Sequence, residues 1–429
     1  MDFLSTQSPR LRVSFATAVQ DNVPGDGGLF MPAFLEPFDD LEALLELEWH
    51  PRSVEILTRL LEPELDRAEV ETLVSSAFDF SVPLEPVDGE VAALELFHGP
   101  TLSFKDFGVR FLARVLALLR ARAGETRERT VLTATSGDTG AAVARAFWRQ
   151  PGFSAVVLYP KGRVSALQER QFATLGDNVR AFAIEGSFDD CQALVNQCFA
   201  DEALASELGL LSANSINVAR LVAQILYYFE AAARKSRAGS LVVSVPCGNF
   251  GNLCAGLLAQ RLGAPIGALV VATNDNRAVP DYLTDGRYVP RPSVATLSNA
   301  MDVGAPNNWQ RVTYLFGGDW QALRAGLRWG VADQAQTRAA IADLTRLGYS
   351  ADPHGAVAYS VLRETLRHGE QGVFLATAHP AKFDATFDPA QPLPPALAEV
   401  ASRPVLAETL PVDLAQLTKK IRERTASAS

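Results

Sequence analysis

The chain has 429 residues, of which 48% are hydrophobic and 21% are charged, a balance typical of a globular protein with two or three domains. Its formal net charge of −10 at pH 7 argues against non-specific binding to nucleic acid or to an anionic membrane surface. No apolar run is long enough to span a membrane, and a small positive pocket for an anionic substrate remains compatible with the charge.

The first 95 residues are predicted to form a separate, mainly helical N-terminal domain. A glycine-rich turn at 25–30 is followed by helical patterns at 39–48 and 66–78, in which apolar residues recur at helical spacing. The rhythm of the sequence changes after this point, which predicts a domain boundary near residue 95.

Lys105 lies in an apolar segment, 97–108, that is broken by glycine and proline. It is flanked by Phe104 and Phe107 and precedes an amphipathic helical run at 107–119. Because burial disfavours an ammonium group, we expect the pKa of Lys105 to lie below its usual range, and a deprotonated lysine is a nucleophile for aldehydes. This setting indicates pyridoxal phosphate (PLP). The alternative is a solvated surface lysine, which is the more common situation before a helix.

From residue 130 onward, strand and helix patterns alternate. The predicted strands are 130–134, 155–159, 179–184, 241–245, 268–273 and 372–377. The predicted helices are 141–148, 165–174, 189–199, 218–234, 253–262, 334–347 and 355–367. Such alternation predicts parallel sheets wrapped by helices, with ligands at the carboxyl ends of the strands. The stretch 274–330 lacks a clear pattern and is predicted to be irregular.

The fold class is therefore predicted to be α/β, with two open, mostly parallel domains besides the N-terminal one. We expect a large α/β domain from 96–130 and 215–395 and a small α/β domain at 131–214. The residues 396–429 are predicted to form a C-terminal tail that runs over the surface.

A glycine-rich junction between a predicted strand and a predicted helix is suited to a phosphate group. It consists of Gly248, Asn249, Phe250, Gly251 and Asn252. Glycines let the backbone approach a phosphate, and a helix N-terminus supplies N–H donors and the positive end of the helix dipole. The alternative is an ordinary tight turn.

Two further junctions have residues suited to anions. At 136–140, Ser136 and Thr139 offer hydroxyl groups that suit a carboxylate, or that simply cap the helix. Asn217 is predicted to cap the long helix, with Arg220 in its first turn. An arginine there is disfavoured by the helix dipole unless an anion is close, and the alternative is an exposed arginine.

The cysteines and histidines indicate neither a metal site nor disulfides. Cys191 and Cys198, and likewise Cys247 and Cys254, are seven residues apart, and the five histidines form no zinc-binding pattern. The first five residues have no basic segment of a signal peptide. We therefore expect a cytoplasmic protein with reduced thiols and no metal.

The segment 98–106 resembles the PLP-lysine motif of the threonine synthases. Further segments that resemble this family are 27–32, 135–140, 246–252, 297–302, 352–356 and 377–383. These segments have the order of the family and cover nearly the whole chain, and the sequence is similar to the longer type found in enteric-like bacteria. The resemblance implies PLP fold type II, in which the large α/β domain binds the cofactor.

The resemblance also implies a role for each candidate residue. Lys105 would hold PLP covalently and carry protons, the segment 248–252 would bind the cofactor phosphate, and Thr377 would face the pyridine nitrogen. The substrate residues it implies are Ser136, Asp138 and Thr139 for the carboxylate and Lys161, Asn217 and Arg220 for the phosphate. Asp138 would also approach the cofactor's phenolic oxygen.

The implied activity is that of a lyase in threonine biosynthesis. It converts O-phospho-L-homoserine and water to L-threonine and phosphate, and it is expected as a monomer or a homodimer. Two residues depart from the family pattern: Cys247 stands where serine is expected, and Gly355 where threonine or alanine is more usual.

Two alternatives remain open at this point. A threonine dehydratase-like or cysteine synthase-like enzyme would share the lysine and the glycine-rich loop, but would not need Lys161 and Arg220 for a second phosphate. A non-catalytic α/β protein that binds phosphate or a nucleotide is the alternative from another class, and the apolar setting of Lys105 argues against it.

Overall fold

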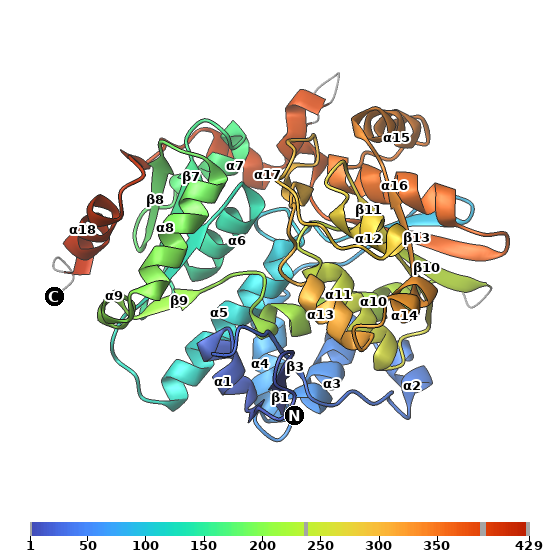
Figure 1. Ribbon diagram of the computed structural model, residues 1–429, viewed down its shortest axis with the longest axis horizontal. Helices are drawn as coiled ribbons and strands as arrows, with labels where there is room; N and C mark the ends of the chain where they lie inside the picture. The colour runs from blue at the N-terminus through green and yellow to red at the C-terminus, as the bar shows by residue number, and fades with distance from the viewer. Residues whose placement is uncertain (1, 236–238, 387–391, 426–429) are drawn as a thin grey trace. The chain divides into compact units, whose positions relative to one another are not determined.

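The computed structural model describes residues 2–235, 239–386 and 392–425 (Figure 1). The chain forms two compact units: unit 1 consists of Met1–Phe111 and Ser215–Ala390, and unit 2 of Leu112–Asn214 and Gln391–Ser429. Both units combine a parallel or mostly parallel sheet with helices, which confirms the predicted α/β class. In the described ranges, no helix has the length and apolar character needed to cross a membrane.

The large sheet of unit 1 has six strands. They are β4 (Leu84–Asp88), β5 (Val91–Glu95), β10 (Ser240–Pro246), β11 (Ile266–Thr273), β12 (Leu327–Val331) and β13 (Glu370–Ala376). Their order is β12-β11-β10-β13-β5-β4; β4 pairs antiparallel with β5, and the other four pairs are parallel. Parallel strands that are buried on both faces have continuous apolar sequences, which is why β10 and β11 could be predicted.

Helices cover both faces of this sheet (Figure 1). They are α10 (Val218–Arg234), α11 (Gly251–Arg261), α15 (Gln334–Arg346) and α16 (Pro353–Thr365). Val242 and Phe374 share a buried cluster with apolar residues of α15 and α16. Since side chains alternate along a strand, Val243 faces the opposite side, where α11 packs against β11 and α10 against α11.

The N-terminal part of unit 1 contains helices and a small antiparallel sheet. Its elements are β1 (Phe3–Ser5), β2 (Arg12–Val13), α1 (Phe15–Asp21), β3 (Phe30–Pro32), α2 (Leu41–Glu46), α3 (Trp49–Leu61) and α4 (Arg67–Ala77). The strands lie in the order β2-β1-β3. The two predicted helices are present as α2 and α4, whereas α3 and this sheet were not predicted.

The segment 274–330, predicted to be irregular, contains regular structure besides strand β12. Its helices are α12 (Ala278–Asp285), η1 (Asn299–Met301), α13 (Trp309–Leu315) and α14 (Trp320–Gly326). The prediction is wrong for these elements, because helices of seven or eight residues complete too few turns to show a clear apolar period. A further short helix in unit 1 is η2 (Pro380–Thr386).

Unit 2 is built around a five-stranded parallel sheet in the order β14-β8-β7-β6-β9. Its strands are β6 (Arg129–Ala134), β7 (Phe153–Pro160), β8 (Val179–Ile184), β9 (Leu210–Ser212) and β14 (Glu408–Leu410). Its helices are α6 (Asp138–Phe147), α7 (Ala166–Ala173), α8 (Phe188–Ala200), α9 (Glu202–Leu208), α17 (Pro395–Ala401) and α18 (Leu414–Thr425). Helix α5 (Lys105–Arg122) begins in unit 1 and continues in unit 2.

The C-terminal segment does more than run over the surface. Strand β14 extends the sheet of unit 2 by pairing with β8, and Leu417 and Ile421 of α18 join the apolar cluster that also contains residues of α8. The expectation of a surface tail is therefore wrong for the described part of this segment, since Leu410, Leu417 and Ile421 are buried.

Local signals explain where several helices begin. Helix α4 has a capping box in which Asp66 accepts from the N–H of Glu69 and Glu69 accepts from the N–H of Asp66, each at 2.9 Å. The same reciprocal pattern joins Asp333 and Gln336 at the start of α15. These caps fix the chain direction at the helix starts before any tertiary contact is considered.

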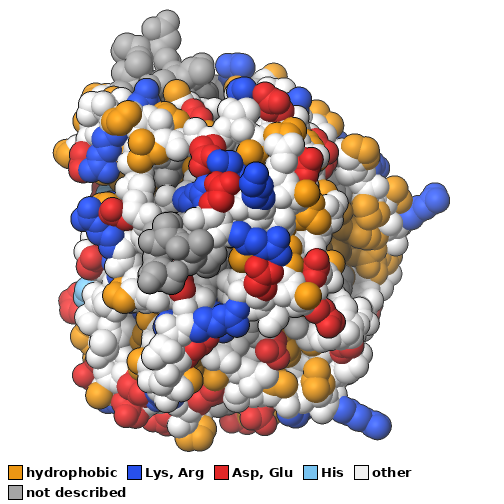
Figure 2. Space-filling view, turned by 90° about the vertical axis from the view of Figure 1, so that its left-hand side faces the viewer, with side chains coloured by type: hydrophobic (Ala, Val, Ile, Leu, Met, Phe, Trp, Pro, Cys, Tyr) orange, Lys and Arg blue, Asp and Glu red, His pale blue; other side chains and the backbone are white. Residues whose placement is uncertain are grey.

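Positive and negative side chains lie next to one another over the face that Figure 2 shows. Exposed ion pairs of the chain include Arg422 with Glu207 at 2.7 Å and Arg149 with Asp177 at 2.6 Å. Solvent and salt screen such exposed pairs, so they contribute little, and the stability of the protein comes mainly from the buried clusters.

Candidate active site

Three neighbouring strands of unit 1 end next to predicted cofactor residues. Strand β10 ends just before the loop 247–250, β13 ends just before Thr377, and β5 ends before the loop that leads to Lys105. Because β5, β13 and β10 are neighbours that run in the same direction, their carboxyl ends meet at one edge of the sheet. We refer to this region as the carboxyl edge.

The loop that carries Lys105 is fixed against the end of β13. The N–H of Phe104 donates to the carbonyl oxygen of Thr377 at 2.8 Å, and Ser103 forms an antiparallel bridge with Ala378. Lys105 is the partly buried first residue of α5, and its Nζ is 4.6 Å from the centre of the Phe104 ring. The structure thus brings the segments of Lys105 and Thr377 together.

A buried carboxyl group organises this loop. Asp106 is fully buried and accepts hydrogen bonds from the N–H and hydroxyl of Thr101, at 2.9 and 2.8 Å. The buried Lys382 donates to the carbonyl oxygen of Thr101 at 2.8 Å. Burial raises the pKa of Asp106 to about 6, against the lowering effect of the Thr101 hydrogen bonds and of the charges on Arg110 and Lys382. Asp106 was not predicted as a site residue, although it directly follows Lys105.

The glycine-rich loop at the end of β10 has the shape of an anion cradle. Phe250 has a φ of 61°, a left-handed conformation unusual for a bulky residue, and it lets α11 begin at Gly251. A Cβ atom on Gly248 would lie 2.6 Å from the carbonyl oxygen of Ala300, so no side chain fits there. The loop therefore needs glycine at this position, and its strained backbone is typical of a functional turn.

Asn252 supplies a buried donor next to this loop. Its Oδ1 accepts from the hydroxyl groups of Tyr227 and Tyr228, at 2.6 and 2.8 Å. Its Nδ2 is buried and has no hydrogen-bond partner within the described residues. An unsatisfied buried N–H group is unfavourable, so it indicates a place for an acceptor from outside the chain. The loop and Asn252 together fit a phosphate group.

Arg220 lies close to the start of α5. It is 2% exposed, and burial lowers the pKa of its guanidinium to about 10, so it remains charged at neutral pH. A Cβ atom on Gly108 would be 3.0 Å from Cβ of Arg220, which means that the first turns of α5 and α10 pack in close contact. The alternative of an exposed arginine is wrong.

Asn217 caps α10, as predicted. Its Oδ1 accepts from the N–H of Ala219 at 3.1 Å, and its Nδ2 donates to the carbonyl oxygen of Val19 at 2.9 Å. Both ends of the amide are therefore used within the protein. This arrangement suits a residue that positions Arg220, and the predicted contact of Asn217 with the substrate phosphate stays a prediction.

In unit 2, the turn before α6 keeps two hydroxyl groups available. The Thr135 hydroxyl oxygen, which was not predicted to act here, accepts from the N–H groups of Gly137 and Gly140 at 2.9 and 2.8 Å. Neither Ser136 nor Thr139 is therefore needed as a cap, and within the described residues their hydroxyl groups make no hydrogen bond to the protein. The capping alternative is thus not how this helix begins.

Asp138 and Lys161 have different surroundings in unit 2. Asp138 is 7% exposed and accepts from Nε2 of Gln168 at 2.9 Å. Lys161 follows β7, has a side chain that is 52% exposed, and pairs with the exposed Glu185 at 3.1 Å. Such a pair is weak, so it leaves Lys161 able to change partner.

The two departures from the family pattern have local explanations. The thiol of Cys247 donates to the carbonyl oxygen of Val245 at 3.1 Å, and burial raises its pKa well above the usual range. It therefore stays a neutral thiol turned toward its own strand. A Cβ atom on Gly355 would be 3.1 Å from Oδ2 of Asp352, so glycine leaves room beside this buried carboxylate.

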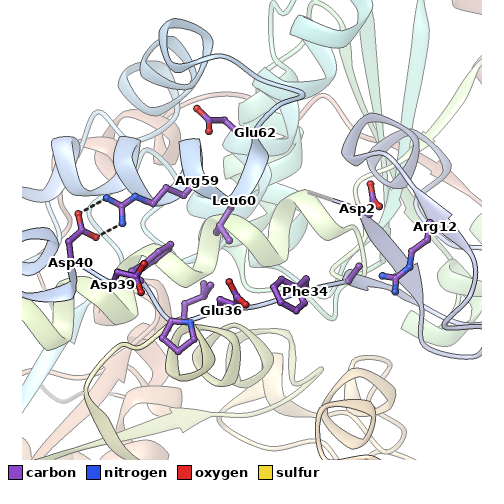
Figure 3. Close-up of a pocket in the computed structure, with 13 residues that line it drawn as sticks. Asp2, Arg12, Phe34, Glu36, Asp39, Asp40, Arg59, Leu60 and Glu62 are labelled. Carbon is purple, nitrogen blue, oxygen red and sulfur yellow. Dashed lines mark hydrogen bonds and ion pairs between the residues drawn. The ribbon is translucent and has the colours of Figure 1, made fainter.

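A separate open groove of about 710 Å³ lies in the N-terminal part of unit 1 (Figure 3). Arg59 is one of its lining residues and donates to both carboxylate oxygens of Asp40, at 2.5 and 2.8 Å. Phe34, 63% exposed, is part of the lining. None of the predicted site residues lines this groove, so its volume does not mark the candidate active site.

Comparisons with known proteins agree with the geometry of the carboxyl edge. Residues 83–377 match the family model of pyridoxal-phosphate dependent enzymes, and residues 355–421 match that of the threonine synthase C-terminal region. The chain is 49% identical to threonine synthase of Escherichia coli strain K12 over 95% of this chain and 96% of that protein. It is 47% identical to threonine synthase of Haemophilus influenzae, over 97% and 98%.

A solved structure extends the likeness to the fold. PLP-bound threonine synthase from Brucella melitensis superposes with a TM-score of 0.92 at 34% identity and covers 99% of both chains. These likenesses favour the predicted activity over a dehydratase-like, a cysteine synthase-like or a non-catalytic protein.

Proposed function

This chain belongs to the threonine synthases, a group of pyridoxal-phosphate-dependent enzymes, and from that membership we propose how its own residues carry the reaction. The substrate is O-phospho-L-homoserine, and the products are L-threonine and phosphate. The observation that carries the proposal is that Lys105, Thr377 and the glycine-rich loop lie together at the carboxyl edge of unit 1.

Residues of the carboxyl edge would hold the cofactor. Lys105 would bind its aldehyde carbon, Thr377 would face its ring nitrogen, and Gly248 to Asn252 would bind its phosphate. When bound, PLP would supply an electron sink that makes the proton on the amine-bearing carbon, Cα, and then those on the neighbouring carbon, Cβ, easier to remove. The buried, unpartnered Nδ2 of Asn252 is the feature of this chain that best fits that phosphate.

Lys105 would also move protons. With the substrate bound, the amine of Lys105 would remove the proton from the substrate Cα and later return it. The hydrogen bonds from Phe104 to Thr377 and from Thr101 to Asp106 hold the loop on both sides of this lysine. They fix the backbone from which the side chain of Lys105 extends.

Arg220 would bind the substrate phosphate. It keeps its positive charge at neutral pH although it is buried, and the close packing at Gly108 holds it near the turn of Lys105. A charged hydrogen bond to phosphate is stronger than a neutral one, and a guanidinium can bind two phosphate oxygens at once. Asn217 would act by fixing the start of α10.

The residues of unit 2 complete the proposal. Ser136 and Thr139 have hydroxyl groups that are free to donate, and they would bind the substrate carboxylate with Asp138 nearby. Lys161 would leave its weak pair with Glu185 to bind the substrate phosphate.

We further propose a cytoplasmic location and a small-molecule partner. All four cysteines are free and buried, which is expected of a protein from a reducing compartment. A monomer and a homodimer are both compatible with this proposal.

The test is phosphate release from O-phospho-L-homoserine by the purified protein with PLP, with L-threonine identified as the product. L-serine and O-acetyl-L-serine serve as substrates of the rival activities. Release of phosphate together with threonine supports the proposal. Turnover of either rival substrate without phosphate release from phosphohomoserine would contradict it.

A further inference from the structure

The segment Asn307–Arg311 forms a rigid backing for the glycine-rich loop. The N–H of Asn308 donates to the carbonyl oxygen of Asn249 at 3.2 Å, and the N–H of Asn307 donates to Oδ1 of Asn249 at the same distance. The ring of Trp309 packs edge-on against Phe250, with centres 5.2 Å apart. This segment therefore contacts the loop at two successive residues, Asn249 and Phe250.

The side chain of Asn308 has one end fixed and the other end free. It is fully buried, and its Oδ1 accepts from Nη1 of Arg311 at 2.6 Å. Because a guanidinium can only donate, the amide is oriented with its Nδ2 on the other side. That Nδ2 lies 3.3 Å from the position of a Cβ atom on Gly251 and has no hydrogen-bond partner within the described residues.

Arg311 is a buried cation whose acceptors are neutral. It is fully buried, and besides Asn308 it donates to the carbonyl oxygens of Phe30, at 3.0 and 2.8 Å, and Ile216, at 2.6 Å. Burial lowers its pKa to about 10, so it stays charged at neutral pH. A buried charge surrounded by dipoles alone is stabilised further by an anion nearby.

We propose that Asn308 is a further ligand of the cofactor phosphate, with its Nδ2 as the donor, and that Arg311 is the positioning residue that orients this amide. Arg311 also places a positive charge behind the amide, where it balances the charge of the phosphate. This inference rests on the proposed function, because it concerns the phosphate group of the same cofactor.

The test uses Asn308→Asp, which keeps the shape of the side chain and its acceptor for Arg311 but replaces the donor with an anionic oxygen. Apoprotein is titrated with PLP and, separately, with pyridoxal, which has the same aldehyde but no phosphate. We expect the Kd for PLP to rise at least about tenfold, whereas that for pyridoxal changes less than about twofold. The 31P NMR signal of bound PLP is expected to shift relative to the wild type.

Asn307→Asp is the matched control, because it adds the same charge one residue away on an exposed side chain. Its Kd for PLP is expected to stay within about threefold of the wild type, since solvent screens an exposed charge. Arg311→Lys is the second variant, which keeps the positive charge but loses the planar guanidinium group. We expect it to weaken the binding of PLP and to leave the binding of pyridoxal unchanged. Thermal unfolding of each apoprotein reports whether the fold is retained.

The outcomes separate this inference from the proposed function. An unchanged Kd for PLP in folded Asn308→Asp would overturn the role of Asn308 while the proposed function stands. An equal loss of affinity for PLP and for pyridoxal would do the same. Wild-type protein that binds neither PLP nor pyridoxal would overturn both.

Discussion

The groove of Figure 3 and the carboxyl edge of the six-stranded sheet both contain arginine, but the charge is balanced differently in the two regions. In the groove, Arg59 is paired with Asp40 and Glu55, and these carboxylates raise the pKa of its guanidinium. Behind the carboxyl edge, Arg311 is fully buried and donates to neutral oxygens.

The difference shows that cavity volume is a weaker guide to function than unsatisfied chemistry. The groove is large and open, yet Arg59, one of the two arginines that line it, already has carboxylate partners. At the carboxyl edge, buried donors on Asn252 and Asn308 have no acceptor within the described residues. Such groups are unfavourable in a folded protein unless a ligand or an ordered water molecule satisfies them.

The largest effect on activity is expected at Lys105. We expect Lys105→Ala to abolish covalent attachment of PLP and to lower phosphate release by about 10⁴-fold or more, because no other amine takes its place. The control is Lys419→Ala, an exposed lysine of α18, which should behave as the wild type. A Lys105→Ala protein with wild-type turnover would contradict the assignment of the site.

A smaller effect is expected at Arg220. Arg220→Ala should lower kcat/KM for the phosphorylated substrate by roughly 10²-fold, since a charged hydrogen bond to its phosphate is lost. The Kd for PLP should change less than about twofold, because the cofactor phosphate has its own loop. Arg220→Lys, which keeps the charge, should recover part of the loss. An equal loss in turnover and in PLP binding would count against this role.

Asp106 is expected to make the stability of the protein depend on pH. Its pKa is raised by burial, so its contribution to stability is complete only below about pH 4 and is lost as the pH rises through about 6. The melting temperature of the apoprotein, relative to that of Asp106→Asn, should therefore fall from pH 4 to pH 7, by the equivalent of about 2 to 3 kcal/mol. A difference that stays constant over this range would contradict the raised pKa.

The smallest effect is expected in the groove. Arg59→Met removes an exposed ion pair with Asp40 and a partly buried one with Glu55, so the free energy of unfolding should fall only slightly. Phosphate release should not change, because none of the site residues lines the groove. A several-fold loss of turnover in a variant of normal stability would show that the groove takes part in function.

Much of the carboxyl edge could be predicted from local patterns. The apolar run 241–245 followed by glycines predicted β10, its loop and α11, and Asn217 predicted the start of α10. Lys105 was placed at a loop-to-helix junction, and it is the first residue of α5. These signals are local, so the sequence near each residue contains them.

Other parts of the site depend on contacts between distant segments. Asn308 and Arg311 lie in a stretch that was predicted to be irregular, and their partners include Phe30 and Ile216. The burial of Asp106 and its hydrogen bonds with Thr101 follow from how the whole loop folds back on itself. Nothing in the local pattern indicates such contacts.

The most direct test of the account is to locate the covalent attachment of the cofactor. Wild-type protein is loaded with PLP, reduced with borohydride, digested and examined by mass spectrometry. The account predicts that the reduced cofactor is found on the peptide that contains Lys105. Attachment to another lysine, such as Lys161 or Lys382, with Lys105 unmodified would contradict it.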